Sequence, residues 1–312
     1  MSFLKYKAAI EEGDTVIICR GRERLIPVIV KRGGVTQVLG GAILHDKLIG
    51  VEFGSKVYTS NNKGWVIVLH PTPELWTLSL PHRTQILYST DISMITMQLE
   101  LRPGSTVCEC GTGSGSLSHA IARTIAPDGH LFTFEFHEKR SQIAKDEFEA
   151  HGLSHIVTVK CSDVCQEGFG LEDRVDAVFL DLPNPWEAIS SAKTAIKRTG
   201  GRICSFSPCI EQVQKTCEEL NKLGFKDIGV MECLLRPFDV RPCVFNIPNM
   251  GSNVDHSTDK SKSTKLTQPI ASSETIWTCA QRRTIPGHTG FLTFATLLHK
   301  DIVSGPSTVD QI

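Results

Sequence analysis

The sequence has no C-x-x-C pair, although it contains eleven cysteines. The nearest cysteine pairs are Cys108 with Cys110 and Cys161 with Cys165, and most cysteines lie in apolar runs such as GRICSF. This pattern excludes the common zinc modules and gives no disulfide framework. We therefore expect no metal site, and we expect reduced cysteines that pack as small hydrophobic residues.

The sequence also has no apolar run of membrane-spanning length, and its start, MSFLKYKAAIEEGD, has no apolar core of signal-peptide length. Of the 312 residues, 40% are hydrophobic and 21% are charged, which is typical of a soluble globular protein. We therefore expect an intracellular protein with no membrane partner. Because the chain exceeds one average domain, we also expect a second, smaller domain.

There is no excess of positive charge: 33 Lys and Arg residues stand against 34 Asp and Glu residues, a formal net charge of −1. A chain that gripped a nucleic acid alone would carry a basic surface, because contacts to phosphates dominate the affinity. Only residues 1–75 lean toward positive charge, with ten Lys and Arg against seven Asp and Glu. The composition is therefore compatible with a second subunit that supplies part of any grip on a polyanion.

The pattern of the chain changes along its length. Residues 1–70 alternate short β-rich runs with turns and predict a small, all-β, barrel-like domain. Residues 71–103 predict a bridging segment with a helix around 85–99. Residues 104–300 predict the main domain, in which a Ser-, Thr- and Lys-rich stretch at 249–275 is expected to be a disordered insertion. Residues 301–312 are expected to form a flexible tail.

In the main domain, strand patterns alternate with helix patterns of ten or more residues, which predicts an α/β fold with a doubly wound, mostly parallel sheet. We expect strands at 106–110, 130–136, 156–161, 175–182 and 202–206, and helices at 117–125, 138–151, 186–197 and 210–223. Two further strand patterns, at 228–235 and 291–298, follow this set and predict an antiparallel edge.

A glycine turn is the strongest functional signal. The run VCECGTGSG at 107–115 leads from a strand pattern into Gly111, Gly113 and Gly115, with Glu109 just before them and Glu135 closing the next strand. Glycines let the backbone approach a ligand, and an acid at that distance suits the hydroxyls of a ribose, so the pattern predicts a cofactor that carries a nucleoside. The spacing differs from the G-x-G-x-x-G of dinucleotide sites. A glycine-rich surface loop remains the alternative.

A second motif, VDAVFLDLPNPW, places Asp181 at the end of the fourth strand of the predicted parallel sheet. Ligands of open α/β sheets bind beyond the carboxyl ends of the strands, so Asp181 is expected beside the glycine turn. If the cofactor is a methyl donor, an acid there could orient a nucleobase, such as adenine, through its exocyclic amine and stabilise the positive charge that grows as a ring nitrogen such as N1 gains the methyl group. The alternatives are a helix-capping Asp181 and a Trp186 that is part of the core.

The chain resembles the catalytic subunit family of the eukaryotic tRNA (adenine-58-N1)-methyltransferases. The segments that carry the resemblance are VLHPTPELWTLSLPHRTQILYSTDI, ECGTGSGSLSHAIAR, DLPNPW, FSPCIEQVQKTC and GHTGFLTFA. It implies a Rossmann-like class I methyltransferase domain that uses S-adenosylmethionine to methylate adenine 58 in the tRNA T-loop, with Asp181 as the catalytic residue. Together with the glycine turn it gives the expected cofactor residues: Leu87, Glu109, Gly111, Gly113, Ser114, Gly115, Ser116, Glu135, Arg140, Asp163, Val164 and Asp181. Asn184 departs from the Asp or Ser of many relatives.

The partners expected from this resemblance are tRNA and a non-catalytic paralogous subunit, in a nuclear heterotetramer of two catalytic and two non-catalytic chains. T-loop-like sites in messenger RNA are a wider substrate range that the sequence leaves open. The candidate tRNA contacts are Arg20, Arg22, His82, Arg83, Pro183, Trp186, Ser207, Pro208 and Cys209. A protein or small-molecule methyltransferase, a nucleotide-dependent dehydrogenase and a non-enzymatic tRNA-binding scaffold remain the alternatives.

Overall fold

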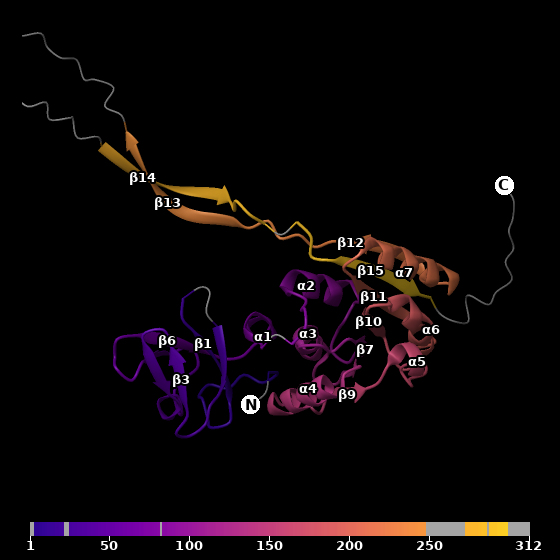
Figure 1. Cartoon of the computed structure of the whole chain (residues 1–312), viewed down its shortest axis with the longest axis horizontal. Coiled ribbons are helices and arrows are strands. Elements are labelled where there is room, and N and C mark those ends of the chain that lie inside the picture. Colours follow the sequence, from indigo (N-terminus) through magenta and orange to yellow (C-terminus); the bar gives the residue numbers. More distant parts are fainter. Residues whose placement is uncertain (1–2, 22–24, 82, 248–271, 286, 299–312) are drawn as a thin grey trace, which may run out of the picture. The chain divides into compact units, whose positions relative to one another are not determined.

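The N-terminal region is built from short antiparallel strands. The computed structural model describes residues 3–21, 25–81, 83–247, 272–285 and 287–298. Four strands form one sheet in the order β2-β1-β6-β5, and two more form the hairpin β3-β4 (Figure 1). The elements of this region are β1 (Thr15–Cys19), β2 (Leu25–Ile29), β3 (Val35–Val38), β4 (Gly41–Leu44), the 3₁₀ turn η1 (His45–Lys47), β5 (Lys56–Tyr58) and β6 (Trp65–Leu69).

Alternating apolar residues join these strands into one core. Val16 and Ile18 of β1 and Val66 and Val68 of β6 are fully buried and pack with Ile43 of β4. Side chains alternate across a strand, so this period of two turns the branched residues to the same face of the sheet. The predicted β-rich N-terminal region is confirmed as two small antiparallel sheets on a common core.

Two helices follow this region, α1 (Pro73–Ser79) and α2 (Ser89–Gln98). Thr72 caps α1, accepting the Leu75 N–H at 3.2 Å, and Pro73 sits at the first helical position, where no backbone donor is needed. The helix expected around 85–99 begins only at Ser89. Residues 85–87 are outside a helix because they line a cavity, described below.

A seven-stranded sheet forms the main domain, in the order β12-β15-β11-β10-β7-β8-β9. Strands β7 to β11 are parallel, and β15 is antiparallel to both β11 and β12, as expected for the edge. The strands are β7 (Thr106–Cys110), β8 (His130–Glu135), β9 (Val157–Cys161), β10 (Ala177–Asp181), β11 (Gly201–Ser207), β12 (Lys226–Met231) and β15 (Phe291–Leu297), and the helices are α3 (Ser116–Ile125), α4 (Glu138–Ala150), α5 (Val164–Glu167), α6 (Pro185–Ala195) and α7 (Ile210–Lys222).

Helices cover both faces of this sheet (Figure 1). Successive residues of β7 point to opposite faces: Val107 packs in the core with α3, whereas Cys108 packs in the core with α6. The chain passes from β7 to β8 and β9 and then returns to the other side of β7 with β10. The switch point of the sheet therefore lies between β7 and β10, where such folds bind ligands.

All eleven cysteines are free thiols. Cys108, Cys110 and Cys204 are buried in the hydrophobic cores, where they pack as small hydrophobic residues, as expected. Three others, Cys161, Cys209 and Cys279, are exposed because they stand at a strand end, a helix start and on a hairpin. Within the described ranges, no helix is both long and apolar enough to cross a membrane, and no group of His, Cys, Asp and Glu side chains is arranged to hold a metal ion.

Residues 234–288 form a separate unit, whose strands β13 (Phe238–Ile247) and β14 (Ser272–Gln281) pair as an antiparallel hairpin. Sequence analysis missed this hairpin, because Pro242 and the polar residues of SSETIWTCAQ weaken both strand patterns. The expected disordered insertion at 249–275 is wrong for residues 272–275, which belong to β14. The rest of it, 249–271, lies outside the described residues, as does the expected tail at 301–312.

Candidate active site

A cavity of about 610 Å³ lies at the carboxyl ends of the central strands, a volume suited to a small-molecule cofactor. Its walls come from the turns after β7, β8, β9 and β10 and from bridge residues 84–87. Of the twelve expected cofactor residues, eleven line it: Leu87, Glu109, Gly111, Gly113, Ser114, Ser116, Glu135, Arg140, Asp163, Val164 and Asp181. The twelfth, Gly115, lies one step outside, where it caps the start of α3.

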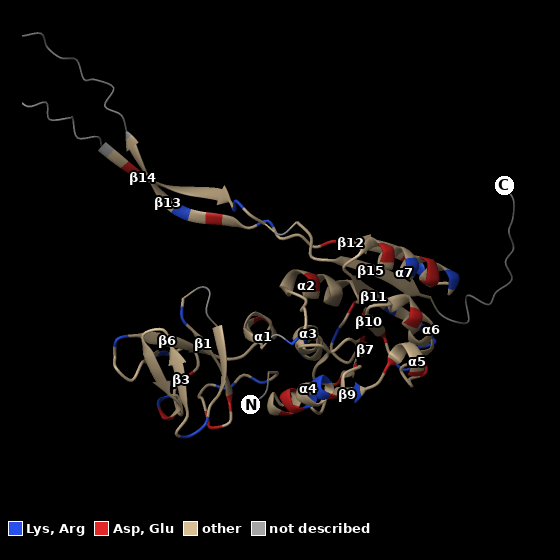
Figure 2. Ribbon diagram, viewed as in Figure 1, with Lys and Arg blue, Asp and Glu red and all other residues tan. Residues whose placement is uncertain are grey.

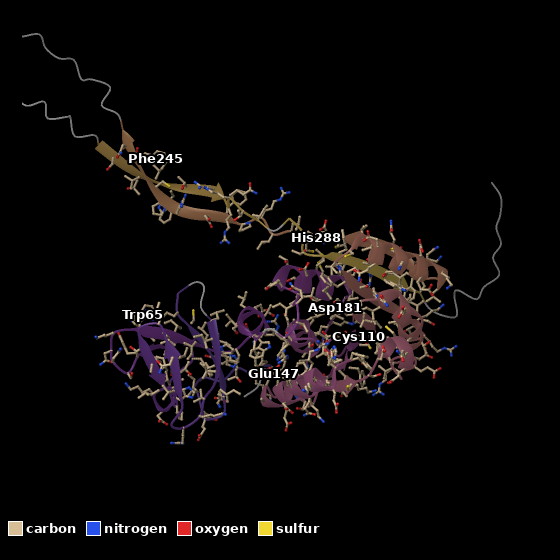
Figure 3. All side chains as sticks on the ribbon, viewed as in Figure 1. Trp65, Cys110, Glu147, Asp181, Phe245 and His288 are labelled. Carbon is tan, nitrogen blue, oxygen red and sulfur yellow. The ribbon has the colours of Figure 1, made fainter. Side chains whose placement is uncertain are left out.

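The glycine turn is pressed against neighbouring loops. A Cβ atom on Gly111 would lie 2.3 Å from the Asp181 carbonyl oxygen, and its φ of +95° is in the left-handed region. A Cβ on Gly113, with φ of +53°, would lie 2.7 Å from Thr84 Oγ1. Both positions therefore require glycine on two grounds, backbone conformation and space. Asp181 and Cys110 come from the adjacent strands β10 and β7 (Figure 3).

Two serines join the bridge segment to this turn. Ser114 Oγ accepts the backbone N–H groups of Arg83 at 3.0 Å and Thr84 at 3.2 Å. Ser116 Oγ donates to the Leu87 carbonyl at 2.9 Å and lies 2.8 Å from Thr77 Oγ1. Since both serines and Leu87 line the cavity, the bridge forms one of its walls. Residues 85–87, where the helix was expected to begin, belong to this wall instead.

Glu135 is held at the end of β8 by four donors. Its Oε2 accepts the Gly113 N–H at 3.0 Å, and its Oε1 accepts the His137 N–H at 3.1 Å. The Arg140 guanidinium donates to the same Oε1 from Nε at 3.0 Å and from Nη2 at 2.7 Å. The carboxylate is therefore fixed beside the glycine turn, as expected for a ribose acceptor. Arg140, about one-third exposed, faces it from α4.

Glu109 is the most deeply buried acid of the cavity, with 1% of its surface exposed. Its Oε2 accepts from Ser118 Oγ at 2.6 Å and Thr133 Oγ1 at 2.7 Å. Burial raises the pKa of Glu109 to about 7, against the opposing effect of these two hydrogen bonds. A negative charge here is therefore costly without a cation, and a bound cation would favour the ionised form.

The Asp181 carboxyl lines the same cavity, and its pKa is raised to about 6, first by burial and then by the nearby charge of Glu135. It is not a helix cap, because Asn184 occupies that position of α6. Asp163 has a second task at the end of β9, where it caps the short helix α5 and accepts the Cys165 N–H at 3.1 Å.

Sequence comparison decides the family. The model of a family described as the tRNA methyltransferase complex GCD14 subunit matches residues 64–297. The chain belongs to the GCD14 family. It is 49% identical over 236 residues to the tRNA (adenine(58)-N(1))-methyltransferase catalytic subunit of Dictyostelium discoideum, a match that covers 74% of this chain and 75% of the relative. The corresponding subunit of Candida albicans is 45% identical over 245 residues, which cover 77% and 73% of the two chains.

Solved structures share the fold of this GCD14-family chain. A SAM-dependent O-methyltransferase from Thermotoga maritima superposes with a TM-score of 0.73 at 27% identity, covering 93% of this chain and 95% of that one. The tRNA (m1A58) methyltransferase TrmI from Aquifex aeolicus superposes with a TM-score of 0.66 at 22% identity, covering 92% and 98%. The expected class I methyltransferase fold, with its antiparallel edge, is therefore confirmed.

The GCD14-family chain uses several predicted tRNA contacts for its own packing. Arg83 forms a two-point ion pair with Glu147, at 2.7 and 2.9 Å, and its predicted phosphate contact stays a prediction. The Nη1 atom of Arg20 is buried beside Gly40, while the residue as a whole is half-buried, and its predicted tRNA contact stays a prediction too. The sequence indicated neither of these neighbours, because both are distant along the chain.

The other predicted tRNA contacts divide into packed and accessible residues. Ser207 is fully buried and Trp186 is half-buried, with Lys215 4.5 Å from its ring centre, and neither lines the cavity, so their predicted tRNA contacts gain no support from it. Pro183 lines the cavity, and Pro208 and Cys209 are exposed. These three remain predictions. Arg22 and His82 lie outside the described residues. Basic and acidic residues are mixed along α4 and α7 (Figure 2).

Sequence analysis missed a buried histidine pair behind the glycine turn. His119 Nδ1 donates to the Gly115 carbonyl at 2.6 Å, and His119 Nε2 lies 2.8 Å from His151 Nδ1. Burial lowers the pKa of His119 to about 4, so the ring is neutral at pH 7 and its Nε2 accepts from His151. The two residues are far apart in sequence, so no local pattern indicates the pair.

Proposed function

We propose that this chain is the catalytic subunit that transfers the methyl group of S-adenosylmethionine to N1 of adenine 58 in the T-loop of tRNA. The relatives named above carry this activity in their names. The observation that supports it most directly is the placement of Asp181 against Gly111, at the sheet's switch point and on the rim of one cavity. A catalytic acid and a cofactor turn thus share one site.

The cavity residues fit the cofactor. Glu135 would accept the ribose hydroxyls, the Gly111–Gly115 turn would hold the methionine part, and Asp163 would accept the adenine amine. S-adenosylmethionine, when bound, supplies an electrophilic methyl group on a positively charged sulfur. A buried acid with a pKa near neutrality suits such a ligand, because a cation nearby restores the ionised form of Glu109.

Asp181 would act on the target base as an oriented acceptor. With a pKa of about 6, its carboxyl is mainly ionised at pH 7 and can then only accept hydrogen bonds. It would accept from the exocyclic amine of the adenine, hold N1 in line with the methyl group and stabilise the positive charge that develops on the ring. The lone pair of N1 is free at neutral pH, so this mechanism needs no strong general base.

The same proposal includes a paralogous, non-catalytic partner and a heterotetramer in the nucleus. The family description names a complex. Two observations on this chain support a partner: its near-neutral charge, and a hairpin that exposes large apolar side chains on both strands. The residues exposed by at least half on this hairpin are Phe238, Val240, Val244, Phe245 and Trp277. Methylation of T-loop-like sites in messenger RNA is the wider form of the proposal.

The test is a product map. The chain is co-expressed with its paralogue and supplied with labelled S-adenosylmethionine and unmodified tRNA, in parallel with a tRNA that carries U at position 58 and with a protein mixture. The proposal requires label at N1 of adenine 58 and none in the U58 tRNA. Label in protein only, or no label in any substrate, would instead support the protein-methyltransferase or scaffold reading.

A further inference from the structure

Gln212 joins two loops that meet beside Asp181. It is the third residue of α7, and β11, which precedes that helix, is the parallel neighbour of β10. The Gln212 Nε2 donates to the Pro183 carbonyl at 2.8 Å, and its Oε1 accepts the Cys209 N–H at 3.2 Å. One side-chain amide therefore links the loop after β10 to the start of the helix after β11.

These two partners fix the chemistry of the bridge. Cys209 N–H can only donate and the Pro183 carbonyl can only accept, so the linking side chain must present an acceptor to the first and a donor to the second. Glu and Gln both serve the third position of a helix capping box. Only Gln also supplies the donor, so helix capping alone does not account for the contact with Pro183.

The bridge acts on the loop that carries Asp181. Pro183 is two residues beyond Asp181, and both line the cavity. On its other side the loop is held against the glycine turn, where the Asp181 carbonyl leaves no room for a Cβ atom on Gly111. The rings of Pro183 and Pro185 restrict the backbone between these points. The backbone at and after Asp181 is thus held at two points, Gly111 and Gln212.

We propose that Gln212 is a positioning residue, which aims the Asp181 carboxylate at the target base by holding the carbonyl of Pro183. This inference rests on the proposed role of Asp181. Removing the Gln212 hydrogen bond to Pro183 should slow methyl transfer and leave cofactor affinity unchanged. The expected cofactor residues other than Asp181 lie elsewhere, in the segment 84–87 and around the ends of β7, β8 and β9.

The test compares Gln212→Glu with Gln214→Glu in the co-expressed complex. Gln212→Glu keeps the capping acceptor, removes the donor and turns a carboxylate toward the Pro183 carbonyl. Gln214 is an exposed residue two positions further along the same helix, so it controls for the added charge. The measurements are kcat on tRNA, KM for S-adenosylmethionine, the melting temperature, and hydrogen exchange of the peptide spanning residues 182–188.

We expect kcat to fall about tenfold in Gln212→Glu, as for the loss of one hydrogen bond from the transition state, with KM for the cofactor changed by less than about twofold. Exchange in residues 182–188 should rise, while melting temperature and the control variant match wild type. An unchanged kcat with unchanged exchange would overturn the inference, as would a fall in kcat accompanied by lower melting temperature. If wild-type enzyme methylates no tRNA, the proposed function itself fails, and the exchange result then shows separately whether the bridge holds the loop.

Discussion

Replacing Glu109 by Gln should change how the stability of the protein depends on pH. The substitution keeps the shape of the side chain, and the Gln oxygen can still accept from Ser118 and Thr133, which lie 2.6 and 2.7 Å from Glu109 Oε2. It removes the ionisable group alone. Any pH-dependent difference between variant and wild type therefore reports the cost of charging this buried carboxyl.

The sign and size of this pH dependence follow from the pKa of Glu109, which is about 7 in the folded protein against an ordinary value of 4.5. A raised folded-state pKa gives stability that is fully present below pH 4.5 and is lost as the pH rises through 7. The difference of 2.5 units corresponds to about 3 kcal/mol in total, of which about 2 kcal/mol falls between pH 5.5 and 8. The variant lacks this loss, so its stability relative to wild type should rise by that amount.

The assay is urea unfolding of both proteins at several pH values and constant ionic strength, with Glu149→Gln, an exposed position on α4, as the matched control. Groups common to all three proteins cancel in the comparison. A difference between Glu109→Gln and wild type that stays constant from pH 5.5 to 8 would refute the assignment of Glu109 as a buried acid that charges near neutrality.

Two further predictions concern His151 and Arg83, whose contacts the sequence did not indicate. Burial lowers the pKa of His151 to about 2, from an ordinary value of 6.5. Wild type should therefore lose stability relative to His151→Asn as the pH falls below 6.5, by about 2 kcal/mol at pH 5. Urea unfolding measures the difference, and a difference that does not depend on pH would contradict a buried neutral ring. Arg83→Gln breaks the two-point ion pair with Glu147 and removes the positive charge, which should cost about 1 kcal/mol of stability. Because Glu147 already occupies the guanidinium, the salt dependence of tRNA binding should not change; a shallower salt slope would show that Arg83 contacts a phosphate.

Local pattern predicts most of the main domain. The strand carrying Glu109 and the strand ending at Asp181 combine a short apolar run with a defined stop, so their carboxyl ends, and the meeting of both acids in one cavity, follow from sheet topology. The glycine turn is equally predictable from the sequence, because the positive φ angles and close contacts at Gly111 and Gly113 admit no other residue.

Contacts between segments that are distant along the chain cannot be predicted from local sequence patterns. Nothing near Arg83 in the sequence indicates Glu147, and nothing near His119 indicates His151. Trp186 stands in a catalytic-looking motif but packs with Lys215 on α7. Such pairs are decided by the packing of helices on the sheet, and hydrophobic periodicity locates a helix face without naming the residue opposite it.

The most direct test of the account separates binding from transfer at Asp181. Calorimetry gives the affinity of the complex for S-adenosylmethionine, and a single-turnover experiment gives the rate of methyl transfer to tRNA, for wild type, Asp181→Ala and the exposed control Asp146→Ala. The account predicts that Asp181→Ala lowers the transfer rate by about 10²- to 10³-fold, with cofactor and tRNA affinities changed by less than about threefold. Equal losses of affinity and rate would make Asp181 a cofactor or structural residue and contradict the proposed mechanism.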